Sequence, residues 1–175
     1  MNEAARAVPV LEGAQVTLRG LRAGDRPRIR EVLADPEVRR WWGYAPLEKD
    51  VDDLFDEDAV GFAIEVEGGH VVGWIQYAEE HEPDYRHASI DLALGDGARG
   101  RGLGPDAIRT LARYLFEVRG HHRITIDPSA ANDRAIRAYE SVGFKPVGVM
   151  RQYERGPDGT FHDGLLLDLL RDELT

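Results

Sequence analysis

A glycine-rich turn lies between a strand pattern and a long helix pattern near the middle of the chain. The sequence LGDGARGRGLGPDAIRTLARYLF, residues 94–116, follows an alternating segment and runs on into apolar residues at helical spacing. The first N–H groups of a helix have no intrahelical acceptor, and the helix dipole is positive at that end. The turn therefore predicts a binding site for an anion.

The residue types in this turn suit such a site. Glycines let a ligand approach the backbone closely, and arginines add positive charge. The residues concerned are Arg99, Gly100, Arg101, Gly102 and Gly104. Pro105 has no N–H, so we expect it at the first helical position, behind the anion. The spacing matches neither GxxxxGK[ST] nor GxGxxG, which excludes a P-loop and a Rossmann turn.

Length and composition predict one domain without disulfides. The chain has 175 residues, of which 42% are hydrophobic, enough for one buried core and too few for two ordinary domains. We expect residues 1–175 to form a single domain, with residues 1–13 as a flexible tail. There is no cysteine, so no thiolate can act as nucleophile or metal ligand. With no apolar run of bilayer length and no signal peptide pattern, we expect a cytoplasmic protein that does not enter a membrane.

The net charge of −10 argues against a nucleic-acid binder, because phosphate backbones are bound by clustered cations. The same charge is compatible with a cationic substrate. It is equally compatible with a protein that is acidic for solubility alone.

Apolar periodicity predicts an α/β or α+β fold with a mixed, mostly antiparallel sheet of about seven strands flanked by helices. Strands are expected at residues 15–22, 87–94 and 123–127, with hairpins at 61–80 and 144–170. Helices are expected at 25–43, interrupted at Pro36, after the glycine turn, and from the cap Asn132 to Gly143. The acidic segment 47–58 is expected to be a short helix or a loop.

At this point the sequence resembles the GNAT superfamily of N-acetyltransferases. RGRGLG, residues 99–104, matches the family's [Q/R]xxGx[G/A] signature, and NDRAIRAYESVGF, residues 132–144, is similar to its second signature. The order of elements from Gln15 to Leu169 also agrees. The resemblance implies a GNAT-like domain with a splayed parallel strand pair at its centre, and acetyl-CoA as cofactor.

The resemblance also implies which residues bind that cofactor. The amides of Arg99, Gly100, Arg101, Gly102, Leu103 and Gly104 would hold the pyrophosphate of coenzyme A. Backbone groups of Leu92, Ala93 and Leu94 would face the pantetheine arm, which Asn132 would also contact. Tyr139 matches the tyrosine that protonates the departing thiolate, a role that stabilises the transition state more than the ground state. A core aromatic on an apolar helix face is the alternative for Tyr139.

The acceptor amine must lose a proton, and a carboxylate, directly or through water, is the natural base. Asp91 is an unusual residue inside a strand. Asp127 is the second candidate, although it also suits a turn before Pro128. No GxSxG or HExxH motif occurs, HEPDY is not a zinc motif, and His121 is expected in an exposed loop, so we expect no metal.

The substrate signal lies in two acidic and aromatic segments. Trp41-Trp42-Gly43 resembles a segment of aminoglycoside 6′-N-acetyltransferases, in which acidic positions matching Asp91 and Asp127 engage the amines of the drug. Carboxylates beside aromatics suit a cationic amine, with the acidic run at 52–58 on the opposite side. The candidate substrate-binding residues are Trp41, Trp42, Tyr77, Glu79, Glu80, Asp84, Asp91 and Asp127.

The sequence therefore favours an N-acetyltransferase acting on an aminoglycoside or similar amino sugar, and hence antibiotic resistance. A polyamine, a siderophore lysine or a protein N-terminus is the alternative acceptor. A non-catalytic acyl-CoA-binding module is the alternative to an enzyme. The acetylated amine, the length of the acyl group, the identity of the base and a homodimer all stay open.

Overall fold

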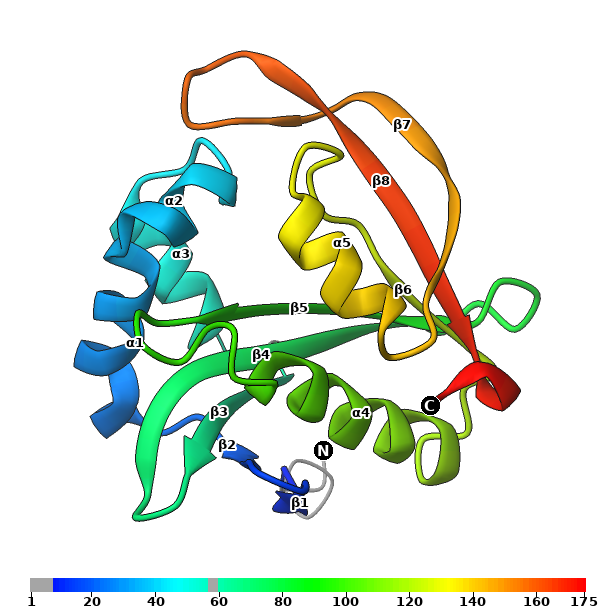
Figure 1. Ribbon diagram of the computed structural model, residues 1–175, viewed down its shortest axis with the longest axis horizontal. Helices are drawn as coiled ribbons and strands as arrows, with labels where there is room; N and C mark the ends of the chain where they lie inside the picture. The colour runs from blue at the N-terminus through cyan, green and yellow to red at the C-terminus, as the bar shows by residue number, and fades with distance from the viewer. Residues whose placement is uncertain (1–7, 57–59) are drawn as a thin grey trace.

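One mixed sheet forms the centre of the fold in the computed structural model, which describes residues 8–56 and 60–175 (Figure 1). Its strand order is β1-β2-β3-β4-β5-β6-β8-β7, and all neighbours are antiparallel except β5 and β6. The strands are β1 (Leu11–Glu12), β2 (Thr17–Gly20), β3 (Val60–Val66), β4 (His70–Glu80), β5 (His87–Leu94), β6 (Arg123–Ile126), β7 (Lys145–Arg155) and β8 (Phe161–Leu170).

In the part of the chain that the structure describes, the sheet has eight strands, where the sequence predicted about seven. The additional strand is β1, which pairs with β2 through Leu11↔Leu18 and Glu12↔Thr17. Part of the segment expected to be a tail is thus an edge strand, and residues 1–7 lie outside the described ranges.

The parallel pair β5–β6 diverges along its length, as the resemblance implied. The two strands are paired at Ala88↔Ile124 and Ser89↔Thr125. Beyond Ser89, β5 continues to Leu94 beside β4 alone, while β6 continues beside β8. The carboxyl ends of the two central strands therefore separate.

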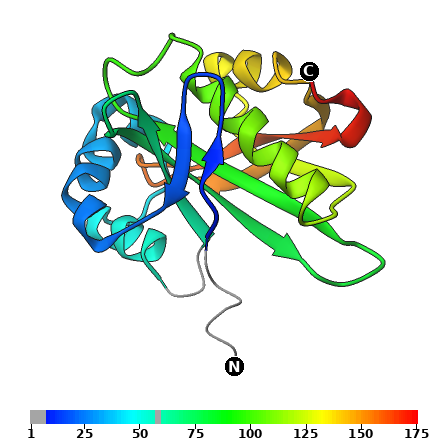
Figure 2. The same ribbon diagram turned by 90° about the horizontal axis from the view of Figure 1, so that it is seen from below.

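Helices cover both faces of the sheet (Figures 1 and 2). They are α1 (Arg26–Ala34), α2 (Pro36–Trp41), α3 (Leu47–Leu54), α4 (Leu103–Glu117) and α5 (Asp133–Glu140), with 3₁₀ turns at Ala23–Asp25 and Arg171–Glu173. The acidic segment after residue 46 thus forms a helix, α3. Within the described ranges, no helix combines the length and the apolarity needed to cross a membrane.

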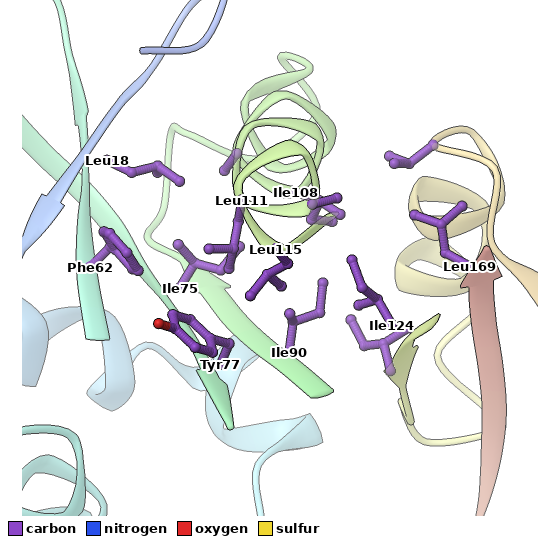
Figure 3. Packing of buried hydrophobic residues seen from close by; sticks show 14 of the residues in the cluster. Leu18, Phe62, Ile75, Tyr77, Ile90, Ile108, Leu111, Leu115, Ile124 and Leu169 are labelled. Carbon is purple, nitrogen blue, oxygen red and sulfur yellow. The ribbon is translucent and has the colours of Figure 1, made fainter. Parts of the chain in front are cut away.

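Alternation along β4 divides the core between the two faces. Ile75 packs in the cluster under α4, whereas Trp74, the next residue back, packs in the cluster under α1–α3. On α4, Ile108, Leu111 and Leu115 are all buried against the sheet (Figure 3). Truncating one such leucine to alanine typically costs about 2–5 kcal/mol, so this face fixes α4 firmly on the sheet.

The C-terminal hairpin β7–β8 arches over α5 toward α2 (Figure 1). At its tip, the guanidinium carbon of Arg155 lies 4.0 Å from the centroid of the Tyr44 ring, a cation–π contact. The hairpin therefore connects the two sides of the molecule above the diverging strands.

Candidate active site

A cavity of ≈ 950 Å³ opens where β5 and β6 separate. Its walls come from the end of β5, the glycine turn, the first turn of α4, the end of β6, α5, α2 and the end of β7. The residues expected to bind the cofactor that line it are Leu92, Ala93, Leu94, Arg99, Gly100, Gly102, Gly104, Asn132 and Tyr139. The structure thus brings residues of both signature segments together around one cavity.

The glycine turn adopts a conformation that requires glycine. Gly100 has φ 73° and Gly102 has φ 81°, both in the left-handed region that side chains with a Cβ rarely occupy. Gly102 is the N-cap of α4, and the first helical hydrogen bond runs from Asp106 N to Gly102 O at 3.1 Å. The amides of Leu103 and Gly104 therefore have no intrahelical acceptor and are suited to an anion.

Pro105 is the third residue of α4, not the first as the sequence predicted. A proline is tolerated throughout the first turn because no N–H there donates within the helix. The main-chain amides of residues 99–104, called the cradle below, therefore include those of the first two helical residues.

The arginines near the turn have different surroundings. Arg134, on α5, lines the cavity, and its Nη2 lies 3.5 Å from where a Cβ on Gly100 would stand. Arg101 does not line it and donates to the Gly97 carbonyl at 3.3 Å. Leu103 is buried in the core, so only its main chain belongs to the turn. Arg134 is a cation at this site that the sequence reasoning missed.

A buried carboxylate fixes the first turn of α4 in place. Asp106 accepts backbone hydrogen bonds from Ala14 at 3.1 Å, Gln15 at 2.7 Å and Val16 at 3.0 Å. These bonds satisfy the carboxylate and attach the β1–β2 turn to α4. The position of the glycine turn is thereby set by a distant part of the chain.

Asn132 caps α5, as the sequence predicted, by accepting a hydrogen bond from Ala135 N at 3.2 Å. Tyr139, on the same helix, packs with its ring centroid 6.3 Å from that of Phe144, and it lines the cavity. Burial, followed by the nearby charges of Asp91 and Asp127, raises the pKa of Tyr139. Its phenol therefore stays protonated at neutral pH.

Asp91 and Asp127 both line the cavity, and each carries a different partner. Gln76 Nε2 lies 3.4 Å from Asp91, while the Tyr153 phenol donates a hydrogen bond to Asp127. Burial, followed by the charge of Asp127, raises the pKa of Asp91. A carboxylate with a raised pKa is a stronger base, provided it is ionised at the working pH.

The tip of the C-terminal hairpin adds a further carboxylate, Glu154, which also lines the cavity. Its pKa is raised by burial and then by the charges of Asp127 and Asp91. Negative charge in this part of the cavity therefore raises the pKa of both Asp91 and Glu154.

Trp41 and Trp42 both line the cavity but have different neighbours. Trp42 packs edge-on against Trp74, with ring centroids 5.0 Å apart, and still lines the cavity. Trp41 lines it as well, under the guanidinium of Arg40, whose carbon lies 4.7 Å from the ring centroid. Trp42 thus serves both in the core and in the cavity wall.

Four residues expected to bind substrate do not line the cavity: Tyr77, Glu79, Glu80 and Asp84. The glycine turn follows the end of β5, whereas residues 79–86 precede its start, at the opposite end of the strand. Tyr77 is 7% exposed and packs in the core. The acidic segment of the β4–β5 loop is thus remote from the diverging strand ends.

Glu79 has structural partners. It accepts hydrogen bonds from Arg119 at 2.8 Å and from the His121 ring at 2.7 Å. These bonds outweigh burial, which alone would raise its pKa, and hold the pKa at about 2. His121 is 1% exposed, so the expectation of an exposed loop residue was wrong.

Two carboxylates of the acidic run at residues 52–58, which was expected on the opposite side of the substrate, form ion pairs with basic side chains. Asp52 pairs with Arg26, and Asp53 pairs with Lys49 at 2.6 Å. Glu57 and Asp58 lie outside the described residues. Glu37 and Asp50 line the cavity instead, from the starts of α2 and α3.

Comparison with known proteins places this site in a family. A model described as acetyltransferase (GNAT) domain matches residues 15–145. The chain is 30% identical over 164 residues to the aminoglycoside N(6′)-acetyltransferase type 1 of Klebsiella pneumoniae, covering 82% of this chain and 79% of that protein. It is 23% identical over 142 residues to the spermidine N(1)-acetyltransferase of Vibrio cholerae, covering 77% and 82%.

A solved structure agrees in fold. The acetyltransferase (GNAT family) from Bacillus anthracis superposes with a TM-score of 0.81 at 18% identity, covering 94% of this chain and 100% of that one. At this identity the likeness concerns the fold alone.

Proposed function

The chain belongs to the GNAT acetyltransferase family, whose members use acetyl-CoA, and on that premise we propose that it acetylates a primary amine of an aminoglycoside or similar amino sugar. Such a reaction would inactivate the antibiotic and confer resistance. The observation that carries the proposal is the separation of charge along the cavity. Arg99 and Arg134 line the cavity at the glycine turn, whereas Asp91, Asp127 and Glu154 line it beside the end of β6 and the end of β7.

The donor end suits coenzyme A. The amides at the start of α4 and the side chain of Arg134 are placed for a diphosphate, and the left-handed glycines leave the backbone open to it. The diverging carboxyl ends of β5 and β6 leave room for an extended arm beside Leu92 to Leu94. Bound there, the cofactor would supply an acetyl thioester, the activated form of the group to be transferred.

The acceptor end suits a cationic amine. Asp91, Asp127 and Glu154 line it, with Trp41 and Trp42 alongside. Carboxylates attract protonated amines, and aromatic faces bind cations and the apolar faces of sugar rings. The Klebsiella relative, named for an aminoglycoside, supports the same class of acceptor.

Two protons move during the proposed transfer. Asp91 accepts the proton that the amine loses as its nitrogen bonds to the acetyl carbon. Tyr139 donates its Oη proton to sulfur as the carbon–sulfur bond breaks. The raised pKa values of both groups support these assignments, because a stronger carboxylate base and a protonated phenol are what the two steps need.

Asp127 has a different part in this scheme. Since it already accepts a hydrogen bond from Tyr153, it is better suited to hold the ammonium group of the substrate than to remove its proton. Its charge also contributes to the raised pKa of Asp91.

A polyamine is the second candidate acceptor. The same carboxylates would bind a linear polycation, and the Vibrio cholerae relative is named for spermidine. The two acceptors differ in shape. A sugar ring therefore stacks on an aromatic face better than a flexible chain does.

A thiol-release assay with acetyl-CoA tests the proposal directly. Kanamycin, neamine, spermidine and an N-terminal peptide should be compared at equal concentration. We expect release of CoA to be fastest with an aminoglycoside. Release with spermidine alone would transfer the assignment to polyamines, and release with none of the four would contradict an amine acetyltransferase of either kind.

A further inference from the structure

An ion pair connects the glycine turn with the helix that carries the acceptor wall. Arg99 Nη1 donates to Asp35 Oδ2 at 2.9 Å and to the Leu94 carbonyl at 2.8 Å. The pair is largely enclosed, with the Asp35 side chain 12% exposed and that of Arg99 20% exposed. The guanidinium therefore holds the end of β5 and the carboxylate at once.

Asp35 also determines where α2 begins. Its second oxygen, Oδ1, accepts a hydrogen bond from Glu37 N at 2.9 Å, which makes Asp35 the N-cap of α2. It is at the same time the C-cap of α1. One side chain thus joins the junction of two helices to an arginine of the donor turn.

Asp35 stays ionised at neutral pH, so the ion pair with Arg99 is kept. Burial alone would raise the pKa of Asp35, but hydrogen bonds from Arg99 and from the Glu37 amide outweigh it, and the pKa lies below its usual range. An enclosed ion pair is weakened much less by salt than an exposed one. The Asp35–Arg99 ion pair is therefore formed at the pH and salt concentration of an ordinary assay.

The helix that Asp35 begins carries much of the acceptor wall. Glu37, Val38 and Trp41 of α2 line the cavity, as does Trp42 directly after it. Arg99 lines the same cavity at the donor turn. An anion bound at that turn would compete with Asp35 for the same guanidinium, and its binding would then act on the start of α2.

We propose that Asp35 is a positioning residue that, through Arg99, couples binding of the donor at the glycine turn to the placement of α2 and hence to acceptor binding. The inference rests on the proposed function, because it assumes that the turn binds the diphosphate. It goes beyond that function by assigning a cause to cooperation between the two substrates.

Tryptophan emission reports the position of α2. The chain has three tryptophans, and Trp41 ends α2, Trp42 follows it, and Trp74 packs against Trp42. Titration with CoA alone should be followed in parallel by calorimetry, which measures affinity, and by intrinsic emission, which reports the surroundings of Trp41 and Trp42. The response of α2 is the part of the emission change that depends on the charge of Asp35.

Asp35→Asn is the test variant, because asparagine keeps the cap on α2 and removes the charge that holds Arg99. Asp96→Asn is the matched control. Asp96 lies 3.5 Å from Arg99 Nη2, but its side chain is 97% exposed and it begins no helix. Asp35→Ser, which also caps, serves as a second variant if the first is poorly folded.

In the wild type we expect CoA binding heat and an emission change with the same midpoint. Asp35→Asn should bind CoA at least as tightly, lose most of the emission change, and raise the KM of the best acceptor about fivefold or more without a matching loss in kcat. Asp96→Asn should behave as the wild type.

The contradicting outcomes are distinguishable. No binding heat in the wild type would overturn the proposed function and this inference together. Binding heat without an emission change, an emission change kept in Asp35→Asn, or an equal loss in Asp96→Asn would overturn the coupling and leave the proposed function standing.

Discussion

The phenol of Tyr153, near the end of β7, donates a hydrogen bond to Asp127, directly after β6. This bond, followed by burial, raises the pKa of Tyr153 to about 12, so the phenol remains the donor at neutral pH. The C-terminal hairpin therefore forms part of the cavity wall beside Asp91 and Asp127. It orients Asp127, whereas Asp91 has a longer contact, to Gln76 at 3.4 Å.

Replacing Tyr139 by phenylalanine removes the proton donor without changing the shape of the ring. We expect kcat to fall about 10²–10⁴-fold, with the Kd of CoA measured by calorimetry unchanged. Wild-type turnover in Tyr139→Phe would show that another group protonates the leaving sulfur.

Gly102→Asp should abolish CoA binding, because it places a negative side chain at the amides of the cradle. Gly97→Asp is the matched control. Gly97 has a similar left-handed backbone, φ 75° against 81°, but does not line the cavity. Calorimetry with CoA should show loss of binding in Gly102→Asp and near-normal binding in Gly97→Asp. Equal affinities in the two variants would contradict a diphosphate site at this turn.

The cradle and the tyrosine were predictable because each depends on a local motif. Glycines ahead of a helix pattern predicted the turn, and capping and apolar spacing predicted Asn132 as a cap and Tyr139 on the helix that follows. Asp91 was singled out because a carboxylate inside a strand pattern is unusual, and it lines the cavity. Alternation and short-range spacing suffice for such residues, since the backbone around them is regular.

The site residues that were not predicted reach the cavity through the tertiary path of the chain. Tyr153 and Glu154 reach the cavity only because the hairpin arches back over α5, and Arg134 only because α5 stands beside the turn. Glu79 was misassigned because nearness in sequence to β5 did not tell which end of that strand it joins. No sequence pattern indicated that Asp35 pairs with Arg99.

The pH dependence of kcat/KM should report Asp91. A base must be ionised, so activity falls as the pH falls through its pKa. Because burial and Asp127 raise that pKa, we expect the acidic limb above the ordinary value of 3.8. Asp91→Asn should lower kcat/KM about 10²-fold and remove this limb. If the limb survives in Asp91→Asn and disappears in Asp127→Asn, the base is Asp127.

Glu154→Gln should weaken binding of a cationic acceptor. Loss of one partly solvated charge is expected to raise KM about two- to fivefold, and to make KM less sensitive to added salt than in the wild type. Glu80→Gln makes the same change of charge at a residue that does not line the cavity, and its KM should be unchanged. Similar effects in both variants would indicate a general effect of net charge.

The central claim is that the amides at the start of α4 hold a diphosphate and bring a thioester to Tyr139. A crystal structure of the protein with bound CoA tests it most directly. We predict the diphosphate against the amides of residues 100–104, with the sulfur within hydrogen-bond distance of Tyr139 Oη. A diphosphate bound elsewhere, or a sulfur remote from the phenol, would contradict the account.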